Sequence, residues 1–244
     1  MGVFTLDILN RTDLYDVANE IEPAVVIHCA ASYSDPNLWH RDADTNISGC
    51  INAAAVARHH SAHLIYFQTI LPPVSSYAIS KIAGEQYLRL SGVPLTVLRL
   101  ANIYGPRNLS GPIPVFYKRI TSGQPCVAVD TTRDMVFIED LVCVVKAVVE
   151  QRATGTYDIC SGEQTPIIDL FNEVQAHLET NEVPPIIPPD PDDVQGSVDL
   201  LNSFQGMYPR TDLAEGIAKT VASYQVSGVD HTHTHLRIGE TDAS

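Results

Sequence analysis

The feature that most constrains the fold is an alternation of short apolar runs with longer helical segments. Residues 23–28 form an apolar run that is too short for a helix and rich in β-branched residues, and residues 63–67 and 94–100 read as similar strands. Helical segments lie between them, at 45–58 and from 77 to about 91. Strands that alternate with helices at this rhythm predict an α/β fold with a parallel sheet and helices on both faces.

Small or polar residues follow each of these strands. Ala30 and Ala31 come after the first strand, Thr69 comes after the second and Asn102 comes just past the third. Parallel α/β sheets bind their ligands at the carboxyl ends of the strands. We therefore expect these residues to converge on one site next to Tyr77.

Tyr77 and Lys81 are four residues apart, which places both side chains on one face of a helix. A tyrosine with an ordinary pKa near ~10 is a poor base at neutral pH, whereas a neighbouring ammonium favours the phenolate. The pair therefore predicts a proton acceptor and its assisting cation. The same spacing also arises by chance on solvated helices, and the pair alone leaves that alternative open.

From about Leu6 to Phe171, the order of motifs resembles the extended short-chain dehydrogenase/reductases. The resemblance is to NAD-dependent nucleotide-sugar epimerases and dehydratases, in particular to epimerases of bacterial surface-polysaccharide clusters. The motifs that carry it are His28-Cys29-Ala30-Ala31, Thr45-Asn46, the pair Tyr77 and Lys81, residues 99–107 and residues 132–141. The resemblance implies a Rossmann-like fold with NAD as cofactor.

The resemblance also implies roles for individual residues. The catalytic residues would be Thr69, Tyr77 and Lys81. The NAD-binding residues would be Asp7, Ala30, Ala31, Asn46, Tyr77 and Lys81. The substrate would be a nucleotide-diphosphate sugar, bound by Asn102, Arg107, Phe116 and Arg133. Phe116 would either stack on the base or lie in the core, and no metal is expected.

The residues after Thr69 narrow the reaction that the resemblance implies. Sugar 4,6-dehydratases of this family need an aspartate and a glutamate there, whereas this sequence has Ile70 and Leu71. We therefore expect an epimerase, in which Tyr77 takes a proton from the sugar while NAD accepts a hydride and returns it. A dehydrogenase or ketoreductase and a catalytically inactive binding form are the alternatives.

Two departures from the family leave open whether this chain is an active enzyme. The sequence holds no Gly-rich turn of the kind whose backbone amides bind the cofactor pyrophosphate at a helix N-terminus. Residues 1–7 resemble a later point of the family fold, so we expect a truncated Rossmann-like sheet and weak or absent NAD binding. The segment between Thr69 and Tyr77 is also shorter than in relatives.

Two interleaved regions and a tail are expected. Residues 1–105 and 126–162 would form a residual NAD-binding, Rossmann-like region. Residues 106–125 and 163–226 would form a smaller α/β substrate-binding region, and residues 227–244 a tail. Outside the segments above, we expect helices at 111–120, 138–150 and 165–178, a strand and turn at 155–162, and an extended acidic stretch at 184–193.

The composition argues against some partners. A net charge of −14 argues against nucleic acid and against an anionic membrane surface. No signal peptide or membrane-length apolar segment is present, so we expect a cytoplasmic protein. Cys29, Cys50, Cys143 and Cys160 lie in apolar runs and are expected in the core of a protein from a reducing compartment.

Other conspicuous residues are expected to have structural roles. The alternating histidines of residues 231–235 could bind a metal, but a solvated tail explains them better. Glu85 is expected to be a surface carboxylate, and Asp134 an ion-pair partner of Arg133. A homodimer through the helices that carry Tyr77 and Asn46 is left open, because residues 53–57 offer a face of small side chains.

Overall fold

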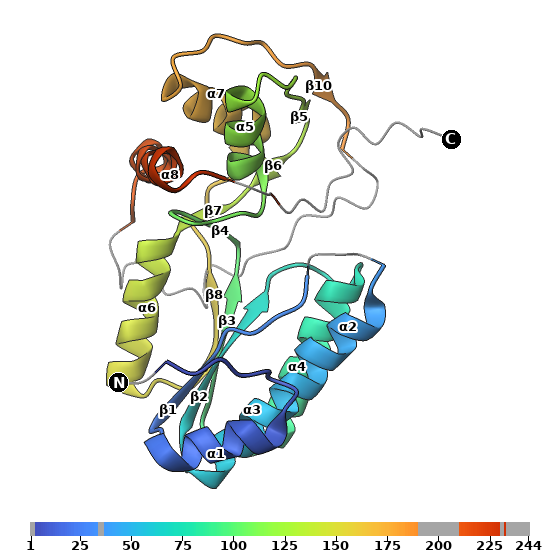
Figure 1. Cartoon of the computed structure of the whole chain (residues 1–244), viewed down its shortest axis with the longest axis vertical. Helices are drawn as coiled ribbons and strands as arrows, with labels where there is room; N and C mark the ends of the chain where they lie inside the picture. Colours follow the sequence, from blue (N-terminus) through green and yellow to red (C-terminus); the bar gives the residue numbers. More distant parts are fainter. Residues whose placement is uncertain (1–2, 34–36, 190–209, 230–231, 233–244) are drawn as a thin grey trace. The chain divides into compact units, whose positions relative to one another are not determined.

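The computed structural model describes residues 3–33, 37–189, 210–229 and 232. The chain divides into two units, each of them discontinuous in sequence. Unit 1 comprises Met1–Leu100 and Val145–Asp158, and unit 2 comprises Ala101–Val144 and Ile159–Ser244. In Figure 1 most of unit 1 is blue to cyan, and most of unit 2 is green or orange to red.

Unit 1 is built on a four-stranded sheet with the strand order β1-β2-β3-β8. The strands are β1 (Val25–His28), β2 (His63–Thr69), β3 (Leu95–Leu100) and β8 (Gly155–Ile159). β1 pairs in parallel with β2, and β2 pairs in parallel with β3. The α/β fold class predicted from the three apolar runs is thus confirmed, and β8 is the strand expected at 155–162.

Two helices pack side by side against this sheet, α3 (Gly49–His59) and α4 (Ser76–Leu90), as Figure 1 shows. Ala53 and Ala57 of α3 lie in one buried cluster with Leu64 of β2. Alanine side chains are short, so α3 can approach the sheet closely while larger strand residues fill the space.

Three further helical segments precede α3 in the chain. They are α1 (Arg11–Ile21), α2 (Trp39–Ala43) and the π-helical turn η1 (Asp44–Ser48). The sequence predicted neither α1 nor α2, and it predicted one continuous helix at 45–58. The chain instead forms η1 and then α3, so the predicted helix is interrupted at its start.

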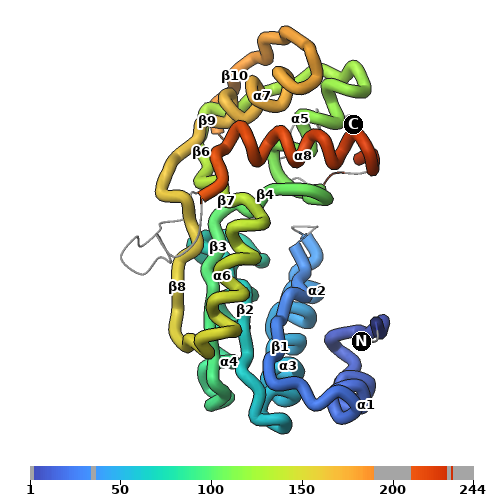
Figure 2. Tube along the Cα trace, turned by 90° about the vertical axis from the view of Figure 1, so that its left-hand side faces the viewer, coloured from blue at the N-terminus to red at the C-terminus, as the bar shows by residue number. Residues whose placement is uncertain are grey.

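Unit 2 is held together by aromatic side chains from three helices. The helices are α5 (Pro112–Thr121), α7 (Ile167–Ala176) and α8 (Leu213–Ser227), which Figure 2 shows next to one another. Phe116 packs edge-to-face on Phe171 with 5.3 Å between ring centroids. The Tyr117 and Tyr224 rings lie 5.1 Å apart. The helices predicted at 111–120 and 165–178 are therefore confirmed, and α8 was not predicted.

Short strand pairs complete unit 2. They are β4 (Asn102–Tyr104) with β7 (Met135–Phe137), β5 (Ala128–Val129) with β10 (Ile186–Ile187), and β6 (Thr132–Arg133) with β9 (Thr165–Pro166). The β4–β7 pair is parallel and the β6–β9 pair is antiparallel. Helix α6 (Ile138–Gln151) follows β7, as predicted, and its residues are divided between the two units.

The cysteines are less uniformly buried than predicted. Cys50 and Cys160 lie in the interior, whereas Cys29 and Cys143 are exposed. Cys29 comes just after the end of β1, and Cys143 lies on an exposed face of α6. An apolar run predicts burial only for the residues that face the core, and neither of these two does.

Some expectations fall at the edge of the described residues. β10 lies in the stretch 184–193, and residues 190–193 of that stretch are outside the described part of the chain. The histidine segment 231–235 is also outside it, apart from Thr232. Among the described residues, no helix is both long and apolar enough to cross a membrane. The same residues contain no cluster of three His, Cys, Asp or Glu side chains with the geometry of a metal site.

Candidate active site

The first turns of α4 carry the predicted catalytic pair. Ser75 caps this helix, because its hydroxyl accepts a hydrogen bond from the Ala78 N–H at 3.2 Å. Tyr77 lies in the first turn, and Lys81 and Glu85 follow at intervals of four residues. Lys81 is only 3% exposed and Glu85 only 1%. Spacing and burial therefore place Lys81 and Glu85 on the helix face that covers the sheet.

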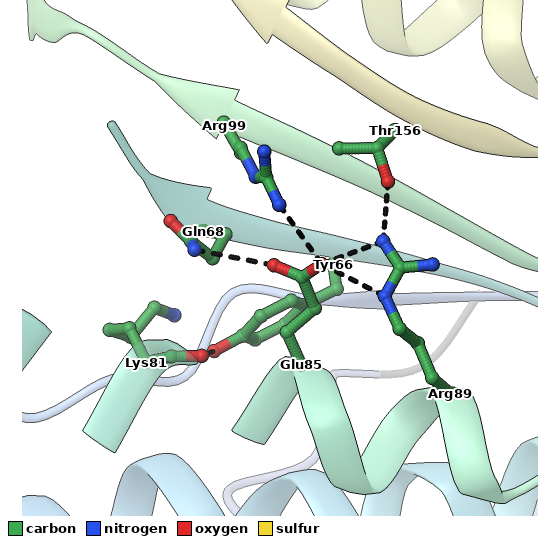
Figure 3. A network of polar contacts seen from close by, with 7 residues as sticks. All are labelled: Tyr66, Gln68, Lys81, Glu85, Arg89, Arg99 and Thr156. Carbon is green, nitrogen blue, oxygen red and sulfur yellow. Dashed lines mark hydrogen bonds and ion pairs between the residues drawn. The ribbon is translucent and has the colours of Figure 1, made fainter. Parts of the chain in front are cut away.

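Lys81 is held by Tyr66 of β2, as Figure 3 shows. The Lys81 Nζ lies 4.3 Å from the centroid of the Tyr66 ring, in a cation–π contact. The Tyr66 hydroxyl donates a hydrogen bond to the main-chain oxygen of Lys81 at 3.0 Å. Burial lowers the pKa of Lys81 to about 8, against the opposing influence of Cys50 and Cys29. The amine is thus closer to losing its proton than an exposed lysine.

Tyr77 is half-buried, and its ring meets that of Tyr33 edge-on with 6.1 Å between centroids. Burial, followed by Tyr33 and Asp42, raises the pKa of Tyr77 to about 12. The sequence predicted that Lys81 lowers this pKa, whereas the net shift of Tyr77 has the opposite direction. Desolvation is the largest cause, Tyr33 and Asp42 add to it, and the Lys81 ammonium lies over the Tyr66 ring.

Thr69 is buried at the carboxyl end of β2. Its Oγ1 accepts a hydrogen bond from the Leu71 N–H at 3.1 Å, which shapes the turn that leaves the strand. The next residue, Ile70, donates its N–H to the main-chain oxygen of Leu100 at 3.2 Å. Unit 1 therefore contains Thr69, Tyr77 and Lys81 at the end of β2 and the start of α4, where their catalytic roles stay predictions.

Asn46, in the π-helical turn, is fully buried and bonded to the protein itself. Its Oδ1 accepts from the Ser32 N–H at 2.8 Å, and its Nδ2 donates to the Ser32 oxygen and to the Ser80 Oγ, both at 2.9 Å. These bonds tie the segment after β1 to α4. In this structure the Asn46 side chain positions the site, and the predicted contact with NAD remains a prediction.

Two of the predicted NAD-binding residues share a surface hollow of about 550 Å³. Asp7 and Ala30 line it together with apolar neighbours that include Leu6 and Ile8. Apolar walls suit a base, and a carboxylate can accept hydrogen bonds from ribose hydroxyls. The roles of Asp7 and Ala30 in binding NAD stay predictions, and so does that of Ala31, which is exposed one residue further along the chain.

The predicted substrate residues belong to unit 2. The main-chain N–H and side-chain Nδ2 of Asn102 both donate to the Asp134 oxygen, at 3.0 and 3.1 Å. Arg133 donates from Nη1 to the Thr132 oxygen at 2.8 Å. Arg107 is exposed, and its φ of 67° lies in the left-handed region that residues other than glycine seldom occupy. Such backbone strain is common at ligand-binding segments.

The structure shows the contacts of two further residues considered in the sequence, Asp134 and Phe116. The Asp134 carboxylate accepts hydrogen bonds from the Ser161 and Gly162 N–H groups, at 2.7 and 2.8 Å, so it orders a turn. Phe116 is 2% exposed and lies in the aromatic core, which is the second of the two alternatives raised for it.

The prediction that Glu85 is a surface carboxylate is wrong. Its side chain is buried and bonded to Gln68, Arg89 and Arg99. The sequence held a signal for this, since Glu85 follows Lys81 by four residues and must share its helix face. Asp42 and Tyr66 were also missed, because nothing in their sequence context shows that they lie near Tyr77 and Lys81.

The fold and the site together define a class of protein. It is an α/β protein with a parallel sheet that carries a tyrosine–lysine pair on the helix after a central strand. The sequence profile of the NAD dependent epimerase/dehydratase family matches residues 2–160. The chain belongs to this family, and the resemblance seen in the sequence is confirmed.

Solved structures and curated proteins show the same relationship. The chain is similar to the Bordetella bronchiseptica enzyme WbmG in complex with NAD and UDP, with 33% identity, a TM-score of 0.86 and coverage of 96% of this chain and 83% of that one. WbmH of the same organism, in complex with NAD⁺, is 33% identical with a TM-score of 0.86. This match covers 92% of this chain and 83% of that one. The UDP-glucose 4-epimerase of Mycolicibacterium smegmatis is 28% identical over 252 residues, covering 87% of this chain and 80% of that protein.

Proposed function

We propose that this chain is an NAD-dependent epimerase of a nucleotide-diphosphate sugar, with a UDP-sugar as its substrate. The observation that carries the proposal is the Tyr77–Lys81 pair on α4, next to the carboxyl end of β2. The absence of an acidic pair after Thr69 favours epimerisation over dehydration. The similarity to enzymes crystallised with NAD and UDP supports both ligands.

In this mechanism Tyr77 Oη takes the proton of a sugar hydroxyl and later returns it to the same oxygen. When bound, NAD would supply the hydride acceptor for the carbon that bears this hydroxyl and the hydride donor for the ketone that results. Thr69 Oγ1 hydrogen-bonds the reacting oxygen. Because burial raises the pKa of Tyr77 to about 12, its phenolate needs a compensating cation, and Lys81 is the ammonium nearest in sequence on the same helix.

The residues of unit 1 fit the two ends of NAD. The apolar hollow with Asp7 suits the adenosine, and Lys81 and Tyr77 suit the hydroxyls of the nicotinamide ribose. In unit 2, Arg107 and Arg133 would bind the substrate diphosphate, since a chain of net charge −14 must gather its cations locally to hold an anion. Asn102 would contact the sugar diphosphate beside them.

The product of the reaction tests the proposal. The protein is incubated with UDP-hexoses and with UDP-hexuronates, and the products are separated and assigned by NMR. NAD is supplied in excess so that the cofactor is not limiting. We expect an epimer of one of these sugars. Accumulation of a 4-keto-6-deoxy sugar would favour a dehydratase, and the lack of any conversion would contradict the proposal.

We propose further that a second copy of the chain covers the face formed by α3 and α4. Ile51, Tyr87 and Leu90 line a hollow of about 680 Å³ there, and Leu90 is 83% exposed. Exposed apolar side chains that cluster on one face are typical of interfaces. Light scattering after size-exclusion chromatography should give a dimer that Leu90→Glu converts to monomer. A monomeric wild-type protein would refute this.

A cytoplasmic location is the last part of the proposal. All five cysteines are free thiols, which suits a reducing compartment. Fractionation of the source cells should recover the protein with its thiols intact, and recovery from an oxidising compartment would contradict it.

A further inference from the structure

A buried carboxylate forms the centre of a polar network one helical turn beyond Lys81, as Figure 3 shows. The Glu85 Oε1 accepts from Arg89 Nε at 2.9 Å, from Arg89 Nη2 at 2.6 Å and from Arg99 Nη2 at 3.3 Å. The Glu85 Oε2 accepts from Gln68 Nε2 at 3.2 Å. A carboxylate that is 1% exposed is thus bonded through both oxygens.

This network joins α4 to three strands of the sheet. Gln68 belongs to β2 and Arg99 to β3. Arg89 also donates from Nη2 to Thr156 Oγ1 at 2.6 Å, and Thr156 lies on β8. Directional bonds to three neighbouring strands restrict sliding and rotation of the helix far more than apolar contacts do.

The energetics favour an orienting role over a stabilising one. Burying a charge costs more than burying an apolar side chain of similar size, and pairing offsets that cost only in part. Within the described part of the chain, Gln68 Oε1 and Arg99 Nε are buried with no hydrogen-bond partner. The network therefore contributes little net stability, and its directional bonds are what fix the position of α4 on the sheet.

Lys81 is the group whose place this geometry determines. Tyr66 and Gln68 are two residues apart on β2, so both side chains lie on the strand face that α4 covers. Tyr66 holds Lys81, and Gln68 holds Glu85, so the two contacts lock one turn of the helix to one strand. Movement of α4 would break both contacts and move the Lys81 amine.

We propose that Glu85 is a positioning residue, which holds α4 on the sheet so that the Lys81 ammonium lies over the Tyr66 ring. The proposal rests on the proposed function only in giving Lys81 a task in catalysis. Glu85 contacts neither of the two predicted catalytic hydroxyls through any bond of the network, and it acts on them through the helix that carries Lys81 and Tyr77.

The titration of the Lys81 amine tests the proposal without any enzyme assay. Lys81 is one of four lysines in the sequence, so its resonance can be assigned with Lys81→Arg after methylation with ¹³C-formaldehyde. In Glu85→Gln the loosened helix should expose the amine, and its pKa should rise from about 8 toward the ordinary ~10.4. Loss of the Glu85 charge alone would lower this pKa, so the sign of the change separates position from charge.

Two further variants keep the test decisive. Glu150→Gln, a matched change on the exposed face of α6, should leave the Lys81 titration as in the wild type. Gln68→Met breaks the link to β2 while the Glu85–arginine bonds remain, and it should raise the Lys81 pKa by a smaller amount. If Glu85→Gln does not fold, Gln68→Met decides the question. A wild-type titration in either folded variant would overturn the proposal.

Kinetics separate this proposal from the proposed function. In an active protein, Glu85→Gln should lower kcat about tenfold with little change in the KM for the sugar nucleotide, as expected when a catalytic group is misplaced. If the wild type converts no UDP-sugar, the proposed function fails while the Lys81 titration still decides the role of Glu85. A tenfold rise of KM for the sugar nucleotide with an unchanged kcat would contradict a positioning role.

Discussion

The two units differ in the kind of contact that holds their buried side chains. Unit 1 buries Asn46, Lys81 and Glu85 among polar partners, whereas unit 2 fills its core with aromatic rings such as Phe116 and Phe171. Aromatic packing stabilises through buried area and tolerates small displacements, but hydrogen bonds to buried groups require a defined geometry. The difference indicates that the surroundings of Lys81 in unit 1 depend on directional polar contacts, whereas the three helices of unit 2 depend on aromatic packing.

The largest effect on stability is expected from the aromatic core of unit 2. Phe171→Ala removes the ring that packs on Phe116, and such truncations cost ~3–5 kcal/mol of unfolding free energy. Denaturant unfolding measures this loss. In the protein that remains folded, the pKa of Lys81 should be as in the wild type. A shifted Lys81 titration would show that the surroundings of Lys81 also depend on the aromatic core of unit 2.

A pH-dependent effect is expected from unit 1. The folded pKa of Lys81 is about 8 and the unfolded value is ~10.4, so the unfolded state binds more protons between these values. The buried amine therefore destabilises the protein fully below pH ~8, and this penalty disappears as the pH rises toward ~10.4. Each pKa unit corresponds to ~1.4 kcal/mol.

Lys81→Met isolates this contribution from other groups that titrate at high pH. Unfolding free energies of the wild type and the variant are compared from pH 7 to 10. The variant should be the more stable at pH 7, and the difference should shrink as the pH rises. A constant difference over this range would show that the Lys81 amine is not desolvated.

A smaller effect is expected from close packing beside the site. A Cβ at Gly84 would lie 2.3 Å from the main-chain oxygen of Asn46 and 2.9 Å from the Cys50 Sγ. Gly84→Ala must therefore push α4 away from η1, and overpacking of this kind costs ~1–3 kcal/mol. The variant should lose turnover beyond its loss of stability, because Lys81 and Tyr77 move with α4. Gln86→Ala, an equally small change at an exposed position of the same helix, is the control and should leave both stability and turnover nearly unchanged.

The sequence predicted the elements whose patterns are local. Strands β1, β2 and β3 are short apolar runs, and α4 has an N-cap serine and a clear helical segment, so all four were found near their observed ends. The π-helical turn at Asn46 could not be predicted, because it depends on bonds to Ser32 and Ser80 that are distant in sequence.

The same reasoning explains the errors in the site. Tyr77 and Lys81 were found from their spacing, but the pKa of Tyr77 depends on burial and on Tyr33 and Asp42, which only the folded chain brings near. Glu85 was assigned to the surface because glutamate is seldom buried, and its three partners come from two strands and the next helical turn. Pairwise contacts between distant segments are what the sequence pattern lacks.

The measurement that tests the account most directly is the turnover of Tyr77→Phe with the UDP-sugar that the wild type epimerises. The substitution removes the phenol oxygen and keeps the ring against Tyr33, so stability should change little. Turnover should fall by roughly 10²–10⁴, the usual contribution of general acid–base catalysis. Thermal unfolding of both proteins serves as the control for folding. Full activity in a folded Tyr77→Phe protein would contradict the role of Tyr77 as the proton acceptor, and with it the proposed mechanism.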